Sequence, residues 1–258
     1  MSATILAFFN VKGGTGKTTA TVNFAYILAN DYNKKVLVID GDQQANTSKA
    51  FNVFNEQGSS LSDLLVNPKA DIKEIIQATQ YPTIDVISSN MSLISANRAV
   101  LVDPLVPQQT RLKAHIEKIK DEYDYIICDC PPNVDMSVIN VLAVADDVII
   151  PVKADRYSFE GCNYVLETVF NLRGINPKLK ILGTFINMFV SSAVNKGGLE
   201  EAKQQAELRC FDTVVRNTVK AIESTYDVPL AEYAPKSTAA SDFKALVAEY
   251  LERKEGEN

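Results

Sequence analysis

One short stretch decides the fold of this chain: Lys12-Gly13-Gly14-Thr15-Gly16-Lys17-Thr18-Thr19. It follows an apolar run at residues 5–9 and precedes a segment of helical pattern that begins at residue 18. Glycines let the backbone curl so that successive N–H groups point inward, and the start of a helix adds partial positive charge. A strand, a glycine-rich loop and a helix in this order predict a phosphate-binding loop.

Two side chains of the loop have expected roles in binding a nucleotide with Mg²⁺. Lys17 is expected to reach the β- and γ-phosphates, and Thr18 to offer its hydroxyl to the metal. Lys12 is an additional lysine, and Val11 stands where the common pattern has its first glycine. Lys12 is either a solvated loop lysine or, beside a triphosphate, a cation for phosphate in its own or a facing protomer. A flexible turn after a strand is the alternative interpretation of the whole loop, but it does not explain the strand–loop–helix order.

Apolar runs alternate with helical patterns along the chain. Strands are expected at 5–9, 36–39, 84–87, 125–128, 148–151, 181–186 and possible at 211–215; helices are expected at 18–29, 71–79, 107–120, 136–145, 158–172 and 196–208. The near-continuous hydrophobicity of the strands indicates that both of their faces are buried. This alternation predicts a doubly wound, mostly parallel α/β sheet flanked by helices.

Acidic and amide residues follow three of these strands, where functional groups of such sheets gather. Asp40 and Asp42 follow the second strand, and one of them can orient a water or join the Mg²⁺ shell while the other braces the loop. Helix capping or a turn is an equally good interpretation of either aspartate. Asp129 occupies the position of a Walker B aspartate and is expected to hold Mg²⁺ through a water, opposite Thr18. Asn187 follows a later strand and is a candidate for the adenine edge, although asparagine often simply ends a strand.

Composition bounds the remaining possibilities. The 258 residues are 46% hydrophobic and 22% charged, which predicts one domain over residues 1–258. The net charge is −6, so any nucleic-acid contact must be a local patch. The four cysteines lack paired spacing and are expected to be buried free thiols in a reducing cytosol. No signal-peptide pattern or membrane-spanning apolar run is present, so a cytoplasmic protein is expected.

Together these motifs resemble the ParA family of partition ATPases, in the short, Soj-like form without an N-terminal DNA-binding domain. The resemblance rests on the lysine-rich loop, Asp40-x-Asp42, the segment that begins Asp129-Cys-Pro-Pro, and residues 138–152, and it extends over nearly the whole chain. It implies the deviant Walker A class of P-loop ATPases.

The resemblance implies an ATP-dependent switch. ATP and Mg²⁺ would bring two protomers face to face, with Lys12 crossing to the phosphates of the other subunit and Asp42 positioning the hydrolytic water. Catalytic roles are thus implied for Lys12, Lys17 and Asp42. The dimer would bind DNA nonspecifically and associate with the nucleoid, and a ParB-like or cargo-adaptor activator would stimulate hydrolysis of ATP to ADP and phosphate.

The sequence departs from the ParA pattern at two places. Gln43-Gln44-Ala45-Asn46 replaces the usual Pro-Gln-Gly-Asn, and Val215-Arg216-Asn217 replaces Pro-Arg-Asn near the base pocket. Nonspecific DNA contacts would come from the final third of the chain, whose candidate cations, each of which could equally be an ordinary surface charge, are Lys196, Lys203, Arg209, Arg216, Lys220, Lys236 and Lys244.

Three alternatives remain open at this point. A MinD-like or other cargo-positioning ATPase of the same class would anchor to a membrane through a basic C-terminal helix, but the apolar stripe at residues 243–251 is flanked by acidic residues and is expected to pack on the sheet. An electron-transfer reductase resembling the nitrogenase iron protein would need cluster-ligating cysteines, for which Cys128 and Cys130 are poorly situated. A scaffold that never hydrolyses nucleotide is disfavoured by the presence of Lys17 and Asp42.

Overall fold

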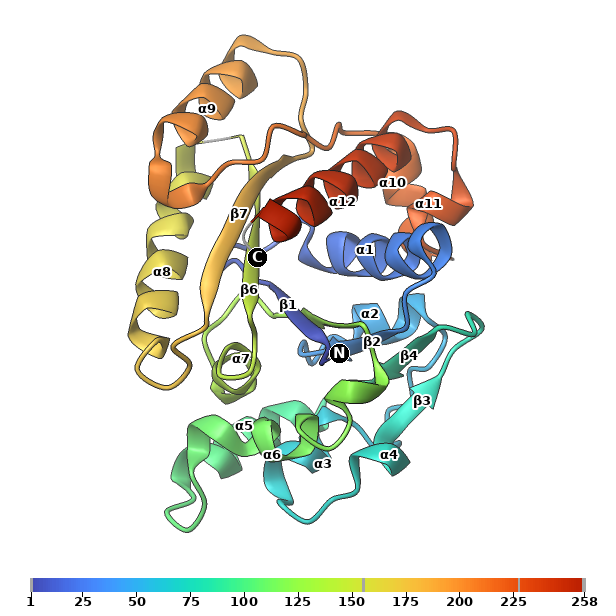
Figure 1. Cartoon of the computed structure of the whole chain (residues 1–258), viewed down its shortest axis with the longest axis vertical. Helices are drawn as coiled ribbons and strands as arrows, with labels where there is room; N and C mark the ends of the chain where they lie inside the picture. Colours follow the sequence, from blue (N-terminus) through green and yellow to red (C-terminus); the bar gives the residue numbers. More distant parts are fainter. Residues whose placement is uncertain (1, 155, 227, 257–258) are drawn as a thin grey trace.

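The computed structural model describes residues 2–154, 156–226 and 228–256. Within these residues one sheet of seven strands runs through the molecule in the order β3-β4-β2-β5-β1-β6-β7 (Figure 1). The strands are β1 (Thr4–Phe8), β2 (Val36–Asp40), β3 (Ile76–Ala78), β4 (Ile84–Ile87), β5 (Tyr125–Asp129), β6 (Asp147–Lys153) and β7 (Lys180–Asn187). All neighbours pair in parallel except β3 with β4, so the predicted doubly wound, mostly parallel sheet is confirmed.

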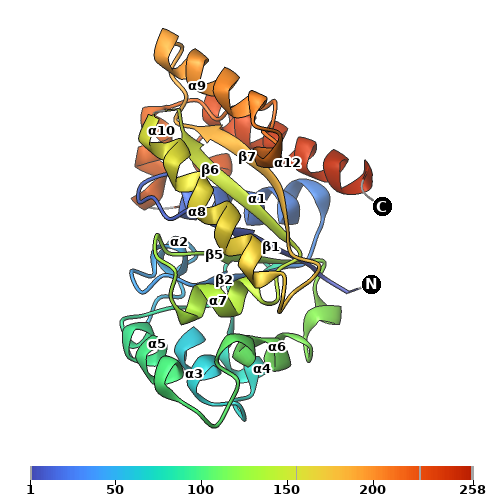
Figure 2. The same cartoon turned by 90° about the vertical axis from the view of Figure 1, so that its left-hand side faces the viewer.

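Helices cover both faces of this sheet (Figures 1 and 2). On one face α1 (Lys17–Tyr32) packs beside α12 (Thr238–Gly256), with α2 (Asn46–Ala50), α10 (Val219–Glu223) and α11 (Leu230–Tyr233) nearby. The other face carries α3 (Leu61–Val66), α4 (Ile72–Ile75), α5 (Ser92–Val102), α6 (Arg111–Ile116), α7 (Met136–Leu142) and α8 (Arg156–Leu172). Helix α9 (Ala193–Gln204) follows β7.

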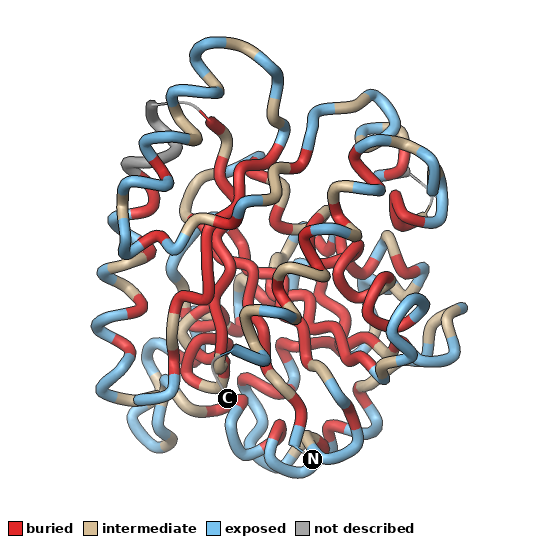
Figure 3. Tube along the Cα trace, turned by 45° about the horizontal axis from the view of Figure 1, so that its top comes forward, coloured by how far each residue is buried: buried red, intermediate tan, exposed pale blue. Residues whose placement is uncertain are grey.

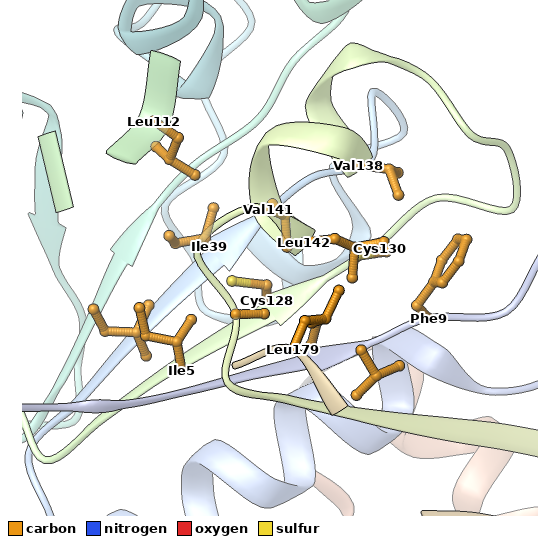
Figure 4. Close-up of a cluster of buried hydrophobic side chains, with 14 of the residues drawn as sticks. Ile5, Phe9, Ile39, Leu112, Cys128, Cys130, Val138, Val141, Leu142 and Leu179 are labelled. Carbon is orange, nitrogen blue, oxygen red and sulfur yellow. The ribbon is translucent and has the colours of Figure 1, made fainter. Parts of the chain in front are cut away.

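The strands form the buried centre of the molecule, as Figure 3 shows. All five residues of β2 are buried, as are six of the seven in β6. One apolar cluster lies between the sheet and α7, where Ile5, Ile39, Cys128 and Val141 meet (Figure 4). A second cluster lies on the α1 side and includes Phe24 and Tyr250, whose rings meet edge to face.

Two predicted elements were wrong. The helix expected at 71–79 ends at Ile75, and Ile76–Ala78 instead form the antiparallel edge strand β3. The strand possible at 211–215 makes only isolated contacts with β7: Phe211 N–H donates to Thr184 O and Val215 N–H donates to Ile186 O. These two donors are four residues apart in this segment, but their acceptors are only two residues apart in β7. The segment therefore does not run in register with β7 as a regular strand would.

The C-terminal apolar stripe packs as predicted. Phe243, Leu246, Val247 and Tyr250 of α12 are all buried, in the cluster on the α1 side. In the described part of the chain, no helix is both long and apolar enough to cross a membrane.

Candidate functional site

The parallel register brings three chain segments to one edge of the sheet. Phe8, the last residue of β1 before the phosphate-binding loop, pairs with Asp129 at the end of β5. Asp129 also pairs with Asp40 at the end of β2. The loop and both strand-terminal carboxylates therefore meet at the carboxyl edge, where ligands of open α/β sheets bind.

The loop takes a backbone shape that only glycine accommodates easily. Gly14 and Gly16 have φ angles of 68° and 89°, which L side chains rarely adopt. A Cβ on Gly16 would stand 2.1 Å from Nδ2 of Asn187, so a side chain there would also collide with β7. Glycine at position 16 is thus required both by its conformation and by close packing.

The side chain of Asn187 is hydrogen-bonded to the phosphate-binding loop in this structure. Its Nδ2 donates to Thr15 O at 2.8 Å, and its Oδ1 accepts from Met188 N–H at 2.9 Å. Asn187 therefore fastens β7 to the phosphate-binding loop. A contact with adenine would require the amide to leave Thr15, and that contact stays a prediction.

Lys17 is buried at the start of α1, with 7% of its surface exposed. Its Nζ donates to Lys12 O at 3.0 Å, which folds the ammonium back across the loop. Burial lowers the pKa of Lys17, and the negative charges of Asp129 and Asp42 act in the opposite direction. A cation held in this way is positioned to meet phosphate oxygens.

Thr18 and Asp129 adopt the arrangement expected of a magnesium site. Thr18 Oγ1 donates to Asp129 Oδ2 at 2.7 Å, and Thr47 Oγ1 donates to the same oxygen at 2.7 Å. Asp129 Oδ1 is buried without a hydrogen-bond partner among the described residues. Burial raises the pKa of Asp129 to about 6, although the two threonines act to lower it. An unsatisfied buried carboxylate oxygen beside a threonine hydroxyl fits a hydrated divalent cation.

Asp40 and Asp42 have different environments. Asp40 is fully buried, and its Oδ2 accepts from the N–H and Oγ of Ser48, while its Oδ1 accepts from Asp42 N–H. Burial and the charge of Asp129 raise the pKa of Asp40 to about 7. Asp42 is partly exposed and lines the cavity described below. Asp40 therefore braces the loop, and Asp42 is the carboxylate that can reach a ligand.

The loop lines one side of a cavity of about 540 Å³, which is large enough for a nucleotide. Asp42, Lys49 and Pro132 also line it, and its other walls come from α1, from Met188 and from the segment that leads into α11. The sequence motifs did not identify that last group, which consists of Ser224, Thr225, Val228, Pro229 and Leu230. Its residue types carry no nucleotide signature. In the structure, Ala231 N–H donates to Asn23 Oδ1, and Leu230 and Ala231 belong to the same apolar cluster as α1, so α11 is held against α1.

Lys12 is partly exposed at the mouth of the loop. Its stem runs past Gly161 of α8, since a Cβ on Gly161 would stand 2.9 Å from Lys12 Cγ and 3.4 Å from Lys12 Cε. The missing side chain at position 161 thus provides the space that the Lys12 stem occupies.

Comparison with known proteins agrees with this geometry. The family model described as an AAA domain matches residues 3–181. The sporulation initiation inhibitor protein Soj of Bacillus subtilis is 34% identical over 250 residues, which cover 95% of this chain and 97% of Soj. The chain belongs to the ParA family of partition ATPases.

Two solved structures share the ParA-type fold of this chain. Apo McdA from Cyanothece superposes with a TM-score of 0.85 at 22% identity and covers 96% of this chain and 99% of its own. Cobyrinic acid a,c-diamide synthase from Mycobacterium smegmatis, with a bound ATP analogue and magnesium, also gives 0.85 at 22% identity, covering 99% and 97%. At these identities the likeness shows the fold alone.

The two departures from the ParA sequence pattern have structural counterparts. Ala45, where most members have glycine, has a left-handed backbone with φ 55° and ψ 36°. Val215, where members often have proline, uses its N–H to bond Ile186 O at 2.8 Å, a bond that proline could not make. Arg216 pairs through two nitrogens with Asp242 of α12, and it is not among the residues that line the cavity.

All four cysteines of this ParA-family chain are free thiols; Cys128, Cys130 and Cys162 are buried as predicted, whereas Cys210 is partly exposed. Cys128 and Cys130 are buried in the apolar cluster beneath α7 (Figure 4). Burial raises the pKa of both thiols, which disfavours the thiolate that an iron–sulfur cluster requires. The structure therefore gives no support to the electron-transfer alternative.

Proposed function

We propose that this protein is an ATP-hydrolysing partition switch. ATP with Mg²⁺ binds in the cavity, and two ATP-bound protomers pair face to face. The pair binds DNA without sequence preference, and a ParB-like or cargo-adaptor protein stimulates hydrolysis and separates it. The observation that carries this proposal is that the loop, Thr18 and Asp42 line one cavity of nucleotide size, with Asp129 directly behind Thr18 and bonded to it.

Mg²⁺ would be held by Thr18 and, through water, by Asp129. Among the described residues there is no group of three His, Cys, Asp or Glu side chains that could hold a metal. The ion would therefore complete its shell with phosphate oxygens and water, as Mg²⁺ commonly does in nucleotide sites. When bound, it neutralises phosphate charge during phosphoryl transfer.

The chain's own groups then have distinct tasks. Loop N–H groups and Lys17 bind the phosphates, while Asp42 orients the attacking water from the wall of the cavity. Asp40 keeps Asp42 in place through the hydrogen bond from Asp42 N–H. Because Asp40 is itself enclosed, it does not compete for the water.

Lys12 would make dimerisation depend on whether the bound nucleotide is ATP or ADP. Two triphosphates that face one another repel strongly unless cations lie between them. The partly exposed Lys12 can supply such a cation to the partner's terminal phosphate. Loss of that phosphate removes the partner of Lys12, so the dimer would persist only while ATP is intact.

The DNA-binding part of the proposal rests on family membership, and the structure narrows its candidate residues. Four of the seven cations suggested by sequence form ion pairs: Lys203 with Asp212, Arg216 with Asp242, Lys220 with Glu223 and Lys244 with Asp31. A paired cation gives less to phosphate binding, because its counter-charge remains nearby. Lys196 and Lys236 form no such ion pair among the described residues and are the better candidates.

Membrane anchoring of the MinD type is not favoured. The apolar side of α12 is already buried against the core, with Leu246 and Val247 wholly enclosed. The helix would have to leave the sheet to insert, which would expose the apolar surface of α1.

The experiment that tests the function is a DNA mobility shift with ADP, ATP and a nonhydrolysable ATP analogue at two salt concentrations. We expect retention only with the triphosphates, weakened by salt, and lost in Lys12→Ala. Lys178→Ala is the matched control, because this exposed lysine precedes the amino end of β7, at the opposite edge of the sheet. Equal retention with ADP and ATP would overturn the switch.

A further inference from the structure

Lys153 lies against the phosphate-binding loop, although no motif marks it. It is the last residue of β6, the strand beside β1, and it pairs in register with Asn187. Its Nζ is 3.7 Å from the point where a Cβ would stand on Gly14. The ammonium therefore lies on the side of the loop toward which a side chain at Gly14 would project.

The charge of Lys153 is not balanced by a nearby carboxylate in the described part of the chain. Its side chain has no hydrogen bond or ion pair with any of the described residues, and the residue is only partly exposed. Lys12 and Lys17 bring two more positive charges to the same loop. Three lysines gathered around one loop repel one another unless an anion lies among them.

The anion that fits is the outer end of a polyphosphate. The glycines at 13 and 14 line the cavity together with Asp42, the proposed water-orienting residue, so this side of the loop faces the reacting phosphate. The triphosphate carries more negative charge here than the diphosphate does. A lysine at this place would therefore interact more strongly with a triphosphate, which carries the terminal phosphoryl group, than with a diphosphate.

We propose that Lys153 is a third phosphate-binding lysine, which acts within its own protomer and makes the site prefer ATP to ADP. This inference rests on the proposed nucleotide-binding function. It identifies Lys153 as the lysine that binds the terminal phosphate of the nucleotide held by the same protomer. Lys12 remains the cation that serves the partner subunit. Because Lys153 acts in cis, its effect should not depend on dimerisation.

The test is equilibrium binding of ADP and of a nonhydrolysable ATP analogue to the full chain. The parent protein carries Lys12→Ala and is used at low concentration, so that binding is measured on monomers. Lys153→Gln removes the charge and keeps a polar side chain that is one atom shorter. We expect it to weaken analogue binding about tenfold or more while ADP binding changes less than about threefold. Lys153→Arg should retain most of the preference.

Controls separate the possible outcomes. Lys178→Gln should leave both affinities unchanged, and urea unfolding should show that Lys153→Gln remains folded. If the parent binds ATP while Lys153→Gln loses no triphosphate preference, or loses it only when Lys12 is intact and dimers form, the cis role is wrong. If the wild-type chain binds no nucleotide at all, the proposed function fails instead.

Discussion

Thr47 donates a hydrogen bond of 2.7 Å to Oδ2 of Asp129, although the two residues are 82 positions apart. Thr47 belongs to the short helix α2, which follows the loop that carries Asp40 and Asp42. The same oxygen accepts from Thr18. The bond to Thr47 therefore joins the segment after β2, which carries Asp42, to the proposed magnesium site at Thr18 and Asp129.

Thr47→Val tests this joint. Once Thr18 turns to the metal, Thr47 becomes the remaining protein donor to Asp129 Oδ2, so its loss should weaken Mg²⁺-dependent nucleotide binding by about three- to tenfold. The free energy of unfolding should fall by about 1 kcal/mol, because a buried acceptor loses a donor. Titration of Mg²⁺ at fixed nucleotide measures the first effect. Thr47→Ser should behave as wild type, and unchanged Mg²⁺ affinity in Thr47→Val would show that the bond is not needed.

Gly16→Ala should damage both the fold and the site. The added Cβ meets Asn187 Nδ2 at 2.1 Å, and the φ of 89° strains any L side chain. We expect a loss of unfolding free energy of about 1–3 kcal/mol and no detectable nucleotide binding. Gly13→Ala is the control for stability, because nothing lies within 4 Å of its Cβ and its backbone is not left-handed. Urea denaturation of both variants makes the comparison, and equal stabilities would refute the packing argument.

Gly161→Ala should act on association through Lys12. Its Cβ would stand 2.9 Å from Lys12 Cγ, so the Lys12 stem must shift. We expect a several-fold weaker ATP-dependent dimer in sedimentation, with monomer affinity for ATP unchanged. Gly197→Ala in α9 has open space around its Cβ and is the matched helix-glycine control. A dimer of normal strength in Gly161→Ala would mean that the Lys12 stem does not need this position.

The buried carboxylates predict a pH dependence of stability. In the unfolded chain an aspartate has lost its proton above about pH 4, whereas burial and Asp129 raise the pKa of Asp40 to about 7 in the folded protein. Between these values the folded state binds more protons, so the free energy of unfolding should fall as pH rises from about 5 to 8.

In Asp40→Asn the free energy of unfolding should decrease by about 1–3 kcal/mol less than in wild type between about pH 5 and pH 8. The amide does not titrate, and its oxygen can still accept from Ser48. Urea unfolding without nucleotide at several pH values measures the slope. Asp121→Asn, at an exposed position, is the control and should leave the slope as it is. A wild-type slope in Asp40→Asn would assign the effect to another group.

The sequence was sufficient for the features that are local in the chain. The loop, the strands that precede Asp40 and Asp129, and the parallel sheet follow from glycine spacing and continuous apolar runs, and the structure has them where they were expected. Strand β3 was missed because three residues are too few to show a period, and the preceding residues 72–75 do form a helical turn.

What the sequence could not show are contacts between distant segments. Thr47, Gly161 and Lys153 reach the site only because the fold brings α2, α8 and β6 to the loop. None has a residue type or spacing that would mark it beforehand. The strand pattern alone did not distinguish Asp40 from Asp42, and only the family resemblance favoured Asp42. The structure adds a physical reason, because burial and the hydrogen bonds from Ser48 make Asp40 the bracing carboxylate and leave Asp42 in the cavity.

The most direct test of the central claim is the molecular mass in solution of Asp42→Ala with ATP and Mg²⁺, by sedimentation equilibrium. This variant should bind ATP, hydrolyse it at least a hundredfold more slowly than wild type, and remain a stable dimer. Adding Lys12→Ala to it should return the protein to monomer while ATP stays bound. A monomeric Asp42→Ala protein saturated with ATP, or a double variant that still dimerises, would contradict the account that Lys12 makes association depend on intact ATP.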